Sequence, residues 1–375
     1  VIAGYARSPF TPARRGELAR TRPDDIAAAV IDGLLKKLNL NPSLVEDLIV
    51  GTAFPEGEQG FNVARMITFL TDLPETVPGV TINRFCGSSM QAIHDAAGRI
   101  AMGAGECFIA GGIESMTRIP MTGFNPMPNP RLLEKAPEAF TSMGITAENL
   151  AVKYGIDRTT QEAFAIESHV RASAARETGK FSDEIIEIST KSKVIDSDGC
   201  IRPGTDATTL EKLRPVFDAD GTVTAGTASP LTDGAAFVVV CTGEFALANG
   251  LTPLAKIASI AVSGCSPEIM GIGPVEATRK ALDRAGLSLG DIDIIELNEA
   301  FAAQSLAVIE ELGLDHSKVN VDGGAIALGH PLGASGARIT GKVASLLVRE
   351  GANHALATMC IGGGQGIATI LSKIE

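Results

Sequence analysis

Two cysteines of this sequence are placed where a thiol could do covalent chemistry. Cys86 lies where a short strand expected over residues 80–83 gives way to a helix expected over 91–99. In the first turn of a helix, free N–H groups and the positive end of the helix dipole favour a thiolate over a thiol. We therefore interpret Cys86 as a nucleophile. A buried cysteine that only fills the core is the alternative that this stretch leaves open.

A histidine and an asparagine in distant loops are candidates to assist such a thiol. His330 stands between Gly329 and Pro331, whose restricted or special backbone angles fix the direction of the imidazole, and this favours a base. Asn298 follows a strand expected over residues 292–297. Its amide could face a reacting oxygen, although capping the next helix is the simpler interpretation.

The second cysteine, Cys360, ends a strand expected over residues 355–360 and precedes three glycines. A thiolate that attacks a thioester exchanges one thiol for another, so an acyl group can be held on the enzyme. Making or breaking a carbon–carbon bond beside that carbonyl also needs an acid or base at the α-carbon and donors for the enolate oxygen. Two cysteines can divide these tasks, one carrying the acyl group and the other moving the proton.

The composition excludes several other classes of protein. The chain has 375 residues, 45% of them hydrophobic, with 41 glycines, which fits a compact α/β enzyme of two or three packed units. The net charge of −12 argues against a nucleic-acid partner. The six cysteines lie singly, without metal-ligand or CxxC spacing, so no metal site is expected. No apolar run is long enough to span a bilayer.

The order of the expected elements indicates an internal duplication. In each half a strand leads to a glycine-rich turn, a helix of small residues and another strand, as in βαβ repeats. We assign residues 1–117 with 232–248 to the first half and 249–375 to the second. Residues 118–231 between them are rich in proline and polar residues, and we interpret them as a loop or cap domain over the site.

Four motifs in this order resemble the thiolase family of acyl-CoA C-acetyltransferases: NRFCGSSMQA, NEAFAAQ, GGAIALGHPLGASGAR and CIGGGQG. The similarity extends over the whole chain. It implies an α/β fold of five layers, αβαβα, in which two βαβαβαββ halves flank an inserted loop domain.

The resemblance also implies roles for individual residues. Cys86 would become acylated, His330 would accept its proton, and Cys360 would deliver or remove the proton at the acetyl α-carbon. Asn298, through a bound water, would form one oxyanion hole with His330. The backbone N–H groups of Cys86 and Gly362 would form the other.

For coenzyme A, the resemblance indicates contacts from Ser259, Arg214 and Met143. Coenzyme A and acyl-CoA would be substrates, with no metal and no permanently bound cofactor. A homodimer or a dimer of dimers is expected, and a hydratase/dehydrogenase partner in a β-oxidation complex is a further alternative. A nucleic-acid partner is not expected.

The stretch EAFTSMGITAEN lacks the histidine and tyrosines usual in biosynthetic acetoacetyl-CoA thiolases, so we predict a degradative 3-ketoacyl-CoA thiolase. The biosynthetic enzyme is the main alternative. A β-ketoacyl synthase is less favoured, since it would need a second histidine, or histidine plus asparagine, in place of Cys360. A silent acyl-CoA-binding subunit is also less favoured, since it would not need the complete catalytic set. A cytoplasmic location is expected for a bacterial source. Because residues are expected to precede Val1, mitochondrial or peroxisomal locations stay open.

Overall fold

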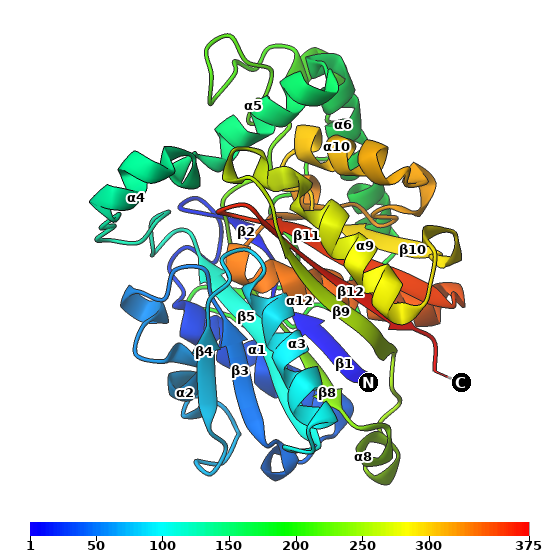
Figure 1. The fold of residues 1–375 in the computed structure, drawn as a ribbon. Coiled ribbons are helices and arrows are strands. Elements are labelled where there is room, and N and C mark those ends of the chain that lie inside the picture. The colour runs from blue at the N-terminus through cyan, green and yellow to red at the C-terminus, as the bar shows by residue number, and fades with distance from the viewer. Residues whose placement is uncertain (375) are drawn as a thin grey trace.

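Two mixed sheets form the framework of the molecule in a computed structural model that describes residues 1–374 (Figure 1). The N-terminal sheet has the strand order β1-β8-β5-β3-β4, and β2 pairs with β8. The C-terminal sheet has the order β10-β11-β12-β9. The strands of the two sheets are β1 (Ile2–Arg7), β2 (Thr11–Pro12), β3 (Asp47–Gly51), β4 (Gly79–Ile82), β5 (Cys107–Ser115), β8 (Thr232–Cys241), β9 (Lys256–Gly264), β10 (Ile294–Leu297), β11 (His354–Ile361) and β12 (Gln365–Ser372).

Helices cover the outer faces of both sheets and fill the space between them. The main helices of the two halves are α1 (Pro23–Leu38), α2 (Val63–Thr68), α3 (Ser88–Ala101), α8 (Gly243–Ala248), α9 (Gly273–Ala285), α10 (Ala302–Leu312), α11 (Ala325–Leu328) and α12 (Leu332–Glu350). One apolar core joins α3 and α12 to the facing sides of both sheets. Separate cores pack α1 and α2 on the outer face of the N-terminal sheet, and α9 and α10 on that of the C-terminal sheet. The predicted five-layer α/β fold is therefore confirmed.

The duplication is present, but one strand of the second half is reduced. The first half runs β1-α1-β3-α2-β4-α3-β5-β8, as a βαβαβαββ repeat requires. In the second half the counterpart of β4 is a single parallel bridge between Ile295 and Val319. The next residue, Asn320, has φ 49° and uses its side chain to bond both the N–H and the C=O of Leu297. These two side-chain hydrogen bonds take the place of the backbone hydrogen bonds that a full strand would make with β10.

The segment inserted between the halves contains α4 (Pro130–Lys135), α5 (Met143–Tyr154), α6 (Arg158–Glu177), α7 (Ala207–Leu210) and a small hairpin of β6 (Ile188–Ser189) and β7 (Val194–Ile195). Both α5 and α6 pack against α10 of the C-terminal half, and Figure 1 shows these three helices together at one end of the molecule. The end of the segment forms bridges from Ala228 to Phe301 and from Leu231 to His330. No helix within residues 1–374 has the length and apolar character needed to cross a membrane.

Arg7 on β1 is the largest buried cation of the first half, and its loss should be costly. Its guanidinium bonds Glu184 through Nε (2.8 Å) and Asp198 through both terminal nitrogens (2.7 and 2.8 Å). Arg7→Met leaves Asp198 without its cation and Glu184 with Lys342 alone, so we expect the free energy of unfolding to fall by about 3–5 kcal/mol. Urea unfolding measures the change. The exposed Arg15→Met serves as the control, and an equal loss in both variants would contradict a specific role for the buried pair.

Candidate active site

Cys86 lies in a tight turn between β4 and α3. The preceding Phe85 has a φ of 43°, which a bulky residue rarely adopts. The turn is held by Ser88, whose Oγ accepts from the Arg84 N–H (2.9 Å) and donates to the Phe85 carbonyl (2.6 Å). A Cβ placed on Gly87 would lie 2.6 Å from Cδ1 of Ile361, so glycine lets the start of α3 approach the end of β11. The sequence pattern at this junction therefore corresponds to a real strand-to-helix turn.

The end of β11 brings the second cysteine to the first. Cys360 is opposite Gly366 in the β11–β12 hairpin, whose turn uses Gly363 and Gly364 with φ values of 78° and 79°. The Gly362 N–H lies close enough to Cys86 to oppose the rise of its pKa, which favours a thiolate there. Burial raises the pKa of Cys360, and the nearby Cys86 raises it further. The two sulfurs thus lie within electrostatic range of each other, although 274 positions of sequence separate them.

His330 is held in one orientation between α11 and α12. Its backbone N–H donates to Thr232 Oγ1 (3.1 Å), and the preceding Gly329 has a φ of 103°. Its Nδ1 lies 2.6 Å from Ser335 Oγ, and that hydroxyl donates to the Pro331 carbonyl (3.3 Å). Since the hydroxyl proton is used, we assign the imidazole proton to Nδ1 and the lone pair to Nε2. A lone pair on Nε2 is what a general base at this position requires.

Asn298 faces the free nitrogen of this histidine. Its Nδ2 lies 3.4 Å from His330 Nε2, and both side chains are buried. Its Oδ1 is also buried and has no hydrogen-bond partner within residues 1–374. The neighbouring Glu299 is fixed by Ser168, Asn320 and the Ile326 N–H, so the loop after β10 is rigidly placed. A side-chain amide and an imidazole therefore face one another at the end of β10.

Close packing of α12 on α3 brings His330 to the side of the molecule that holds Cys86. The Ala337 N–H donates to Ser89 Oγ (2.8 Å). A Cβ on Gly336 would lie 2.5 Å from the Met90 nitrogen, so only glycine permits this approach. The small residues of both motifs thus serve the contact between the two central helices.

Burial keeps both the nucleophile and the base uncharged. It raises the pKa of Cys86 to about 11, and the charge of Glu114 adds to the rise, whereas N–H donors including that of Gly362 oppose it. Burial also lowers the pKa of His330 to about 3, with a smaller effect from Arg338. The expectation that the helix end by itself yields a thiolate is wrong here, because desolvation outweighs it. A neutral thiol and a neutral imidazole suit a proton transfer that accompanies attack.

Two family models match the chain, the thiolase N-terminal domain over residues 1–244 and the thiolase C-terminal domain over residues 251–373. The chain belongs to the thiolase family. The 3-ketoacyl-CoA thiolase of Bacillus subtilis is 49% identical, with 99% of this chain and 98% of the relative covered. That of Saccharophagus degradans is 47% identical, with 100% and 98% covered.

Solved structures agree with this assignment. Human mitochondrial 3-ketoacyl-CoA thiolase is 40% identical with a TM-score of 0.92, and the acetyl-CoA acetyltransferase of Bacillus anthracis is 39% identical with a TM-score of 0.91. Each comparison covers 100% of this chain and 98% of the solved one. The thiolase resemblance predicted from the four motifs is therefore confirmed.

The three residues expected to contact coenzyme A in this thiolase are placed very differently. Met143 packs against the apolar groups that contain Cys86 and Cys360. Arg214 is exposed on the inserted segment, shortly before Phe217, whose ring packs on Phe301 at 5.8 Å. Met143 is thus placed beside the site, whereas Arg214 lies on the segment that reaches Phe301 after β10.

Ser259 is not brought to the site of this thiolase. It is buried, and its Oγ donates to the Ala281 carbonyl of α9 (2.5 Å) on the outer side of the C-terminal sheet. It pairs with Ile370, whereas Cys360 pairs with Gly366, so the two lie roughly 13 Å apart along the strands. The sequence of β9 does not show which of its residues face α9, so the side of the sheet on which Ser259 lies could not be predicted.

Sequence reasoning missed the residues that orient His330, namely Ser335 and Thr232. Ser335 lies in a run of small residues, and the i to i+4 spacing from Pro331 is too weak a signal to single it out. Thr232 begins β8 and becomes a neighbour of His330 only through tertiary pairing. Within residues 1–374 no group of three or more His, Cys, Asp or Glu side chains could hold a metal ion.

Ser335→Ala should slow this thiolase by roughly 10- to 100-fold in kcat, because Nδ1 of His330 loses the acceptor that fixes its tautomer. The fall should appear mainly in kcat rather than in KM, as measured by thiolysis of a 3-ketoacyl-CoA. Ser259→Ala is the matched control, since it removes another buried, bonded hydroxyl away from His330. Equal kcat in Ser335→Ala and wild type would show that Ser335 does not set the tautomer.

Proposed function

We propose that this chain is a degradative 3-ketoacyl-CoA thiolase, an acetyl-CoA C-acyltransferase. It cleaves a 3-ketoacyl-CoA with free coenzyme A to acetyl-CoA and an acyl-CoA shortened by two carbons, and the reverse reaction is a Claisen condensation. The observation that carries the proposal is the close approach of two buried cysteines, because the chain just after Cys86 packs directly against Ile361, the residue next to Cys360. The name 3-ketoacyl-CoA thiolase on the curated relatives supports the degradative direction.

In the first half-reaction, the Cys86 sulfur attacks the C3 carbonyl while its proton passes to Nε2 of His330. The N–H groups of Cys86 and Gly362 hold the resulting oxyanion. The C2–C3 bond then breaks, which leaves the acyl group on Cys86 and the enolate of acetyl-CoA. The amide of Asn298 and the imidazole stabilise the enolate oxygen, and the Cys360 thiol gives its proton to C2 so that acetyl-CoA can leave.

The second half-reaction restores every proton. The thiol of incoming coenzyme A gives its proton to the Cys360 thiolate and attacks the acyl group on Cys86. The Cys86 sulfur is expelled and takes back the proton held by His330. Both cysteines return as neutral thiols, which is the form that their raised pKa values favour in the free site.

The test is a chain-length profile of thiolysis. We expect turnover of 3-ketoacyl-CoA substrates with eight or more carbons, followed by loss of the 3-ketoacyl absorbance and by acetyl-CoA formation. The biosynthetic alternative is favoured by one observation, the similarity to the acetyl-CoA acetyltransferase structure. Turnover confined to acetoacetyl-CoA would establish that alternative and remove the degradative proposal.

We also propose that two copies associate along β4, the last strand of the N-terminal sheet. Beside it, α2 and its flanks expose large apolar side chains, with Phe61 at 92% and Phe69 at 57% of their surface. A symmetric pairing of two edges would cover them. Phe69→Asp is expected to give a monomer in sedimentation, whereas Phe124→Ser in the inserted segment should not. A dimer in both variants would place the contact elsewhere.

Coenzyme A and acyl-CoA are the proposed small-molecule partners, and we propose a cytoplasmic location, which the bacterial origin of the curated relatives supports. A dimer of dimers and a complex with a hydratase/dehydrogenase remain proposals that sedimentation of the native protein addresses.

A further inference from the structure

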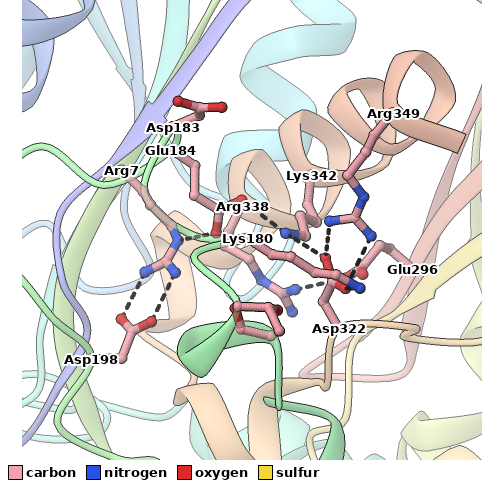
Figure 2. Close-up of polar contacts among 12 residues, drawn as sticks. Arg7, Lys180, Asp183, Glu184, Asp198, Glu296, Asp322, Arg338, Lys342 and Arg349 are labelled. Carbon is pink, nitrogen blue, oxygen red and sulfur yellow. Dashed lines mark hydrogen bonds and ion pairs between the residues drawn. The ribbon is translucent and has the colours of Figure 1, made fainter. Parts of the chain in front are cut away.

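A buried ion pair joins β10, which precedes Asn298, to α12, which follows His330. Arg338 of α12 bonds Glu296 of β10, with 2.6 Å between Nη1 and Oε2, and their side chains are 2% and 0% exposed. Figure 2 shows this pair at one side of a larger buried network of charged groups. Within residues 1–374, Glu296 Oε1 and the other two guanidinium nitrogens of Arg338 have no hydrogen-bond partner. Each member of the pair therefore depends on the other.

The Glu296–Arg338 pair lies close in sequence to the Asn298–His330 contact on both sides. Glu296 and Asn298 are two positions apart, and the Asn298 N–H still bonds the Thr358 carbonyl of β11, so both side chains leave the same face of the extended chain. On α12, Arg338 is one turn after Ser335, which holds Nδ1 of His330. The Glu296–Arg338 contact thus joins β10 to α12, and the Asn298–His330 contact joins the residues that follow β10 to those that precede α12.

Charged groups from several elements face Glu296. They are Arg338 and Lys342 on α12, Asp322 before α11 and Glu184 after α6. Lys342 is bonded to Glu184 and Asp322, and Arg349 and Lys180 also bond Asp322. Only Arg338 bonds Glu296 among these groups. The charge of Arg338 also reaches His330 and opposes its protonation.

We propose that the Glu296–Arg338 ion pair is a positioning device for the reaction: it sets Asn298 against His330, and ionised Glu296 offsets the Arg338 charge that would otherwise weaken His330 as a base. The inference rests on the proposed thiolase function and names Glu296 and Arg338 as positioning residues, since neither bonds the reacting side chains directly.

The proposal gives a definite pH dependence. Burial raises the pKa of Glu296 to about 7, and Arg338 and Lys342 only partly oppose this. Below this pH Glu296 takes up a proton, the pair loses its negative member, and the Arg338 charge acts on His330 without compensation. The kcat of the wild type should therefore fall as the pH drops through about 7.

The closing experiment compares Glu296→Gln with Glu184→Gln, which removes the same charge from the same buried network without touching β10. In Glu296→Gln we expect kcat at pH 8 to fall roughly 10- to 100-fold with little change in KM, as for a misaligned catalytic group. The acid limb near pH 7 should disappear. In Glu184→Gln the melting temperature should fall, but kcat and its acid limb should persist.

A second variant separates alignment from charge and covers a failure of Glu296→Gln to fold. Arg338→Lys keeps the positive charge but replaces the planar guanidinium with an ammonium on a shorter side chain. The alignment of Glu296 should suffer, so kcat should fall, while the acid limb should stay. Lys342→Met on the same helix is its control, with kcat near that of the wild type well above pH 7 and an acid limb moved to higher pH, because Lys342 opposes the rise of the Glu296 pKa. Parallel losses of kcat in each test variant and its control would overturn the proposal, because they would reduce the pair to a stabilising role.

Alkylation of Cys86 by iodoacetamide gives a readout that needs no turnover. It should be slower in Glu296→Gln than in Glu184→Gln if His330 has become a weaker base. Absence of thiolysis in the wild type would remove the proposed function but leave this comparison intact. Equal alkylation rates, with normal thiolysis by all variants, would remove the positioning role alone.

Discussion

Cys86→Ser is expected to lose acylation and turnover together, with thiolysis slower by roughly 10³-fold or more. A serine hydroxyl is a far weaker acid than a thiol, and the His330 imidazole that must take its proton is itself a weak base in this site, with its pKa lowered to about 3. Transfer of an acyl group from the coenzyme A thioester to a cysteine forms another thioester and changes the free energy little. Transfer to a serine forms an oxygen ester, and this energetic balance is lost. Intact-mass measurement after incubation with acetyl-CoA should show a gain of about 42 Da in the wild type and none in the variant.

A matched control is available in the N-terminal sheet. Cys107 on β5 is fully buried and lies opposite Cys241 of β8, away from the reacting groups. Cys107→Ser places the same hydroxyl in a core and should keep both the mass gain and thiolysis. An acetyl adduct that persists in Cys86→Ser would mean that another side chain is the nucleophile, and the division of labour between the cysteines would have to be abandoned.

Local patterns were enough to predict the elements that carry the site. The strand expected over residues 80–83 is β4 (Gly79–Ile82), and the strand expected over residues 355–360 is β11 (His354–Ile361). These segments are set by their own sequence because the apolar pattern and the glycine turns act locally. The weak third strand of the second half could not be foreseen, since it depends on the Asn320 side chain reaching Leu297.

The candidate site was predictable only in part for the same reason. Cys86 and His330 stand in unusual turns that the sequence displays. By contrast, Glu296 and Arg338 look in sequence like ordinary surface charges, and only the packing of α12 on β10 buries them. The protonation of Cys86 was misjudged because a helix start is visible in the sequence whereas the depth of burial is not. Tertiary packing therefore decides the electrostatics that local patterns leave undetermined.

Cys360→Ala should separate the two chemical tasks. The variant keeps Cys86, the N–H groups that hold its acyl oxygen, and His330, so acetyl-CoA should still add about 42 Da, with coenzyme A leaving as a thiolate. It lacks the group that protonates C2, and thiolysis should fall by roughly 10²- to 10⁴-fold. Exchange of the acetyl-CoA methyl protons in heavy water should stop for the same reason. The rates of adduct formation, thiolysis and exchange measure these three effects.

Two outcomes would decide against this division. If acylation fell in Cys360→Ala as far as in Cys86→Ser, Cys360 would be needed to activate the nucleophile, and the proton of Cys86 would not pass to His330 alone. If methyl exchange persisted in Cys360→Ala, another base would act at the α-carbon. Cys241→Ala, which shortens a buried cysteine by the same atom on β8, controls for loss of packing. Because the Cys360 thiol lies beside Cys86 and keeps a raised pKa, it holds its proton until an enolate forms, and this is why removing it should spare the first step and stop the second.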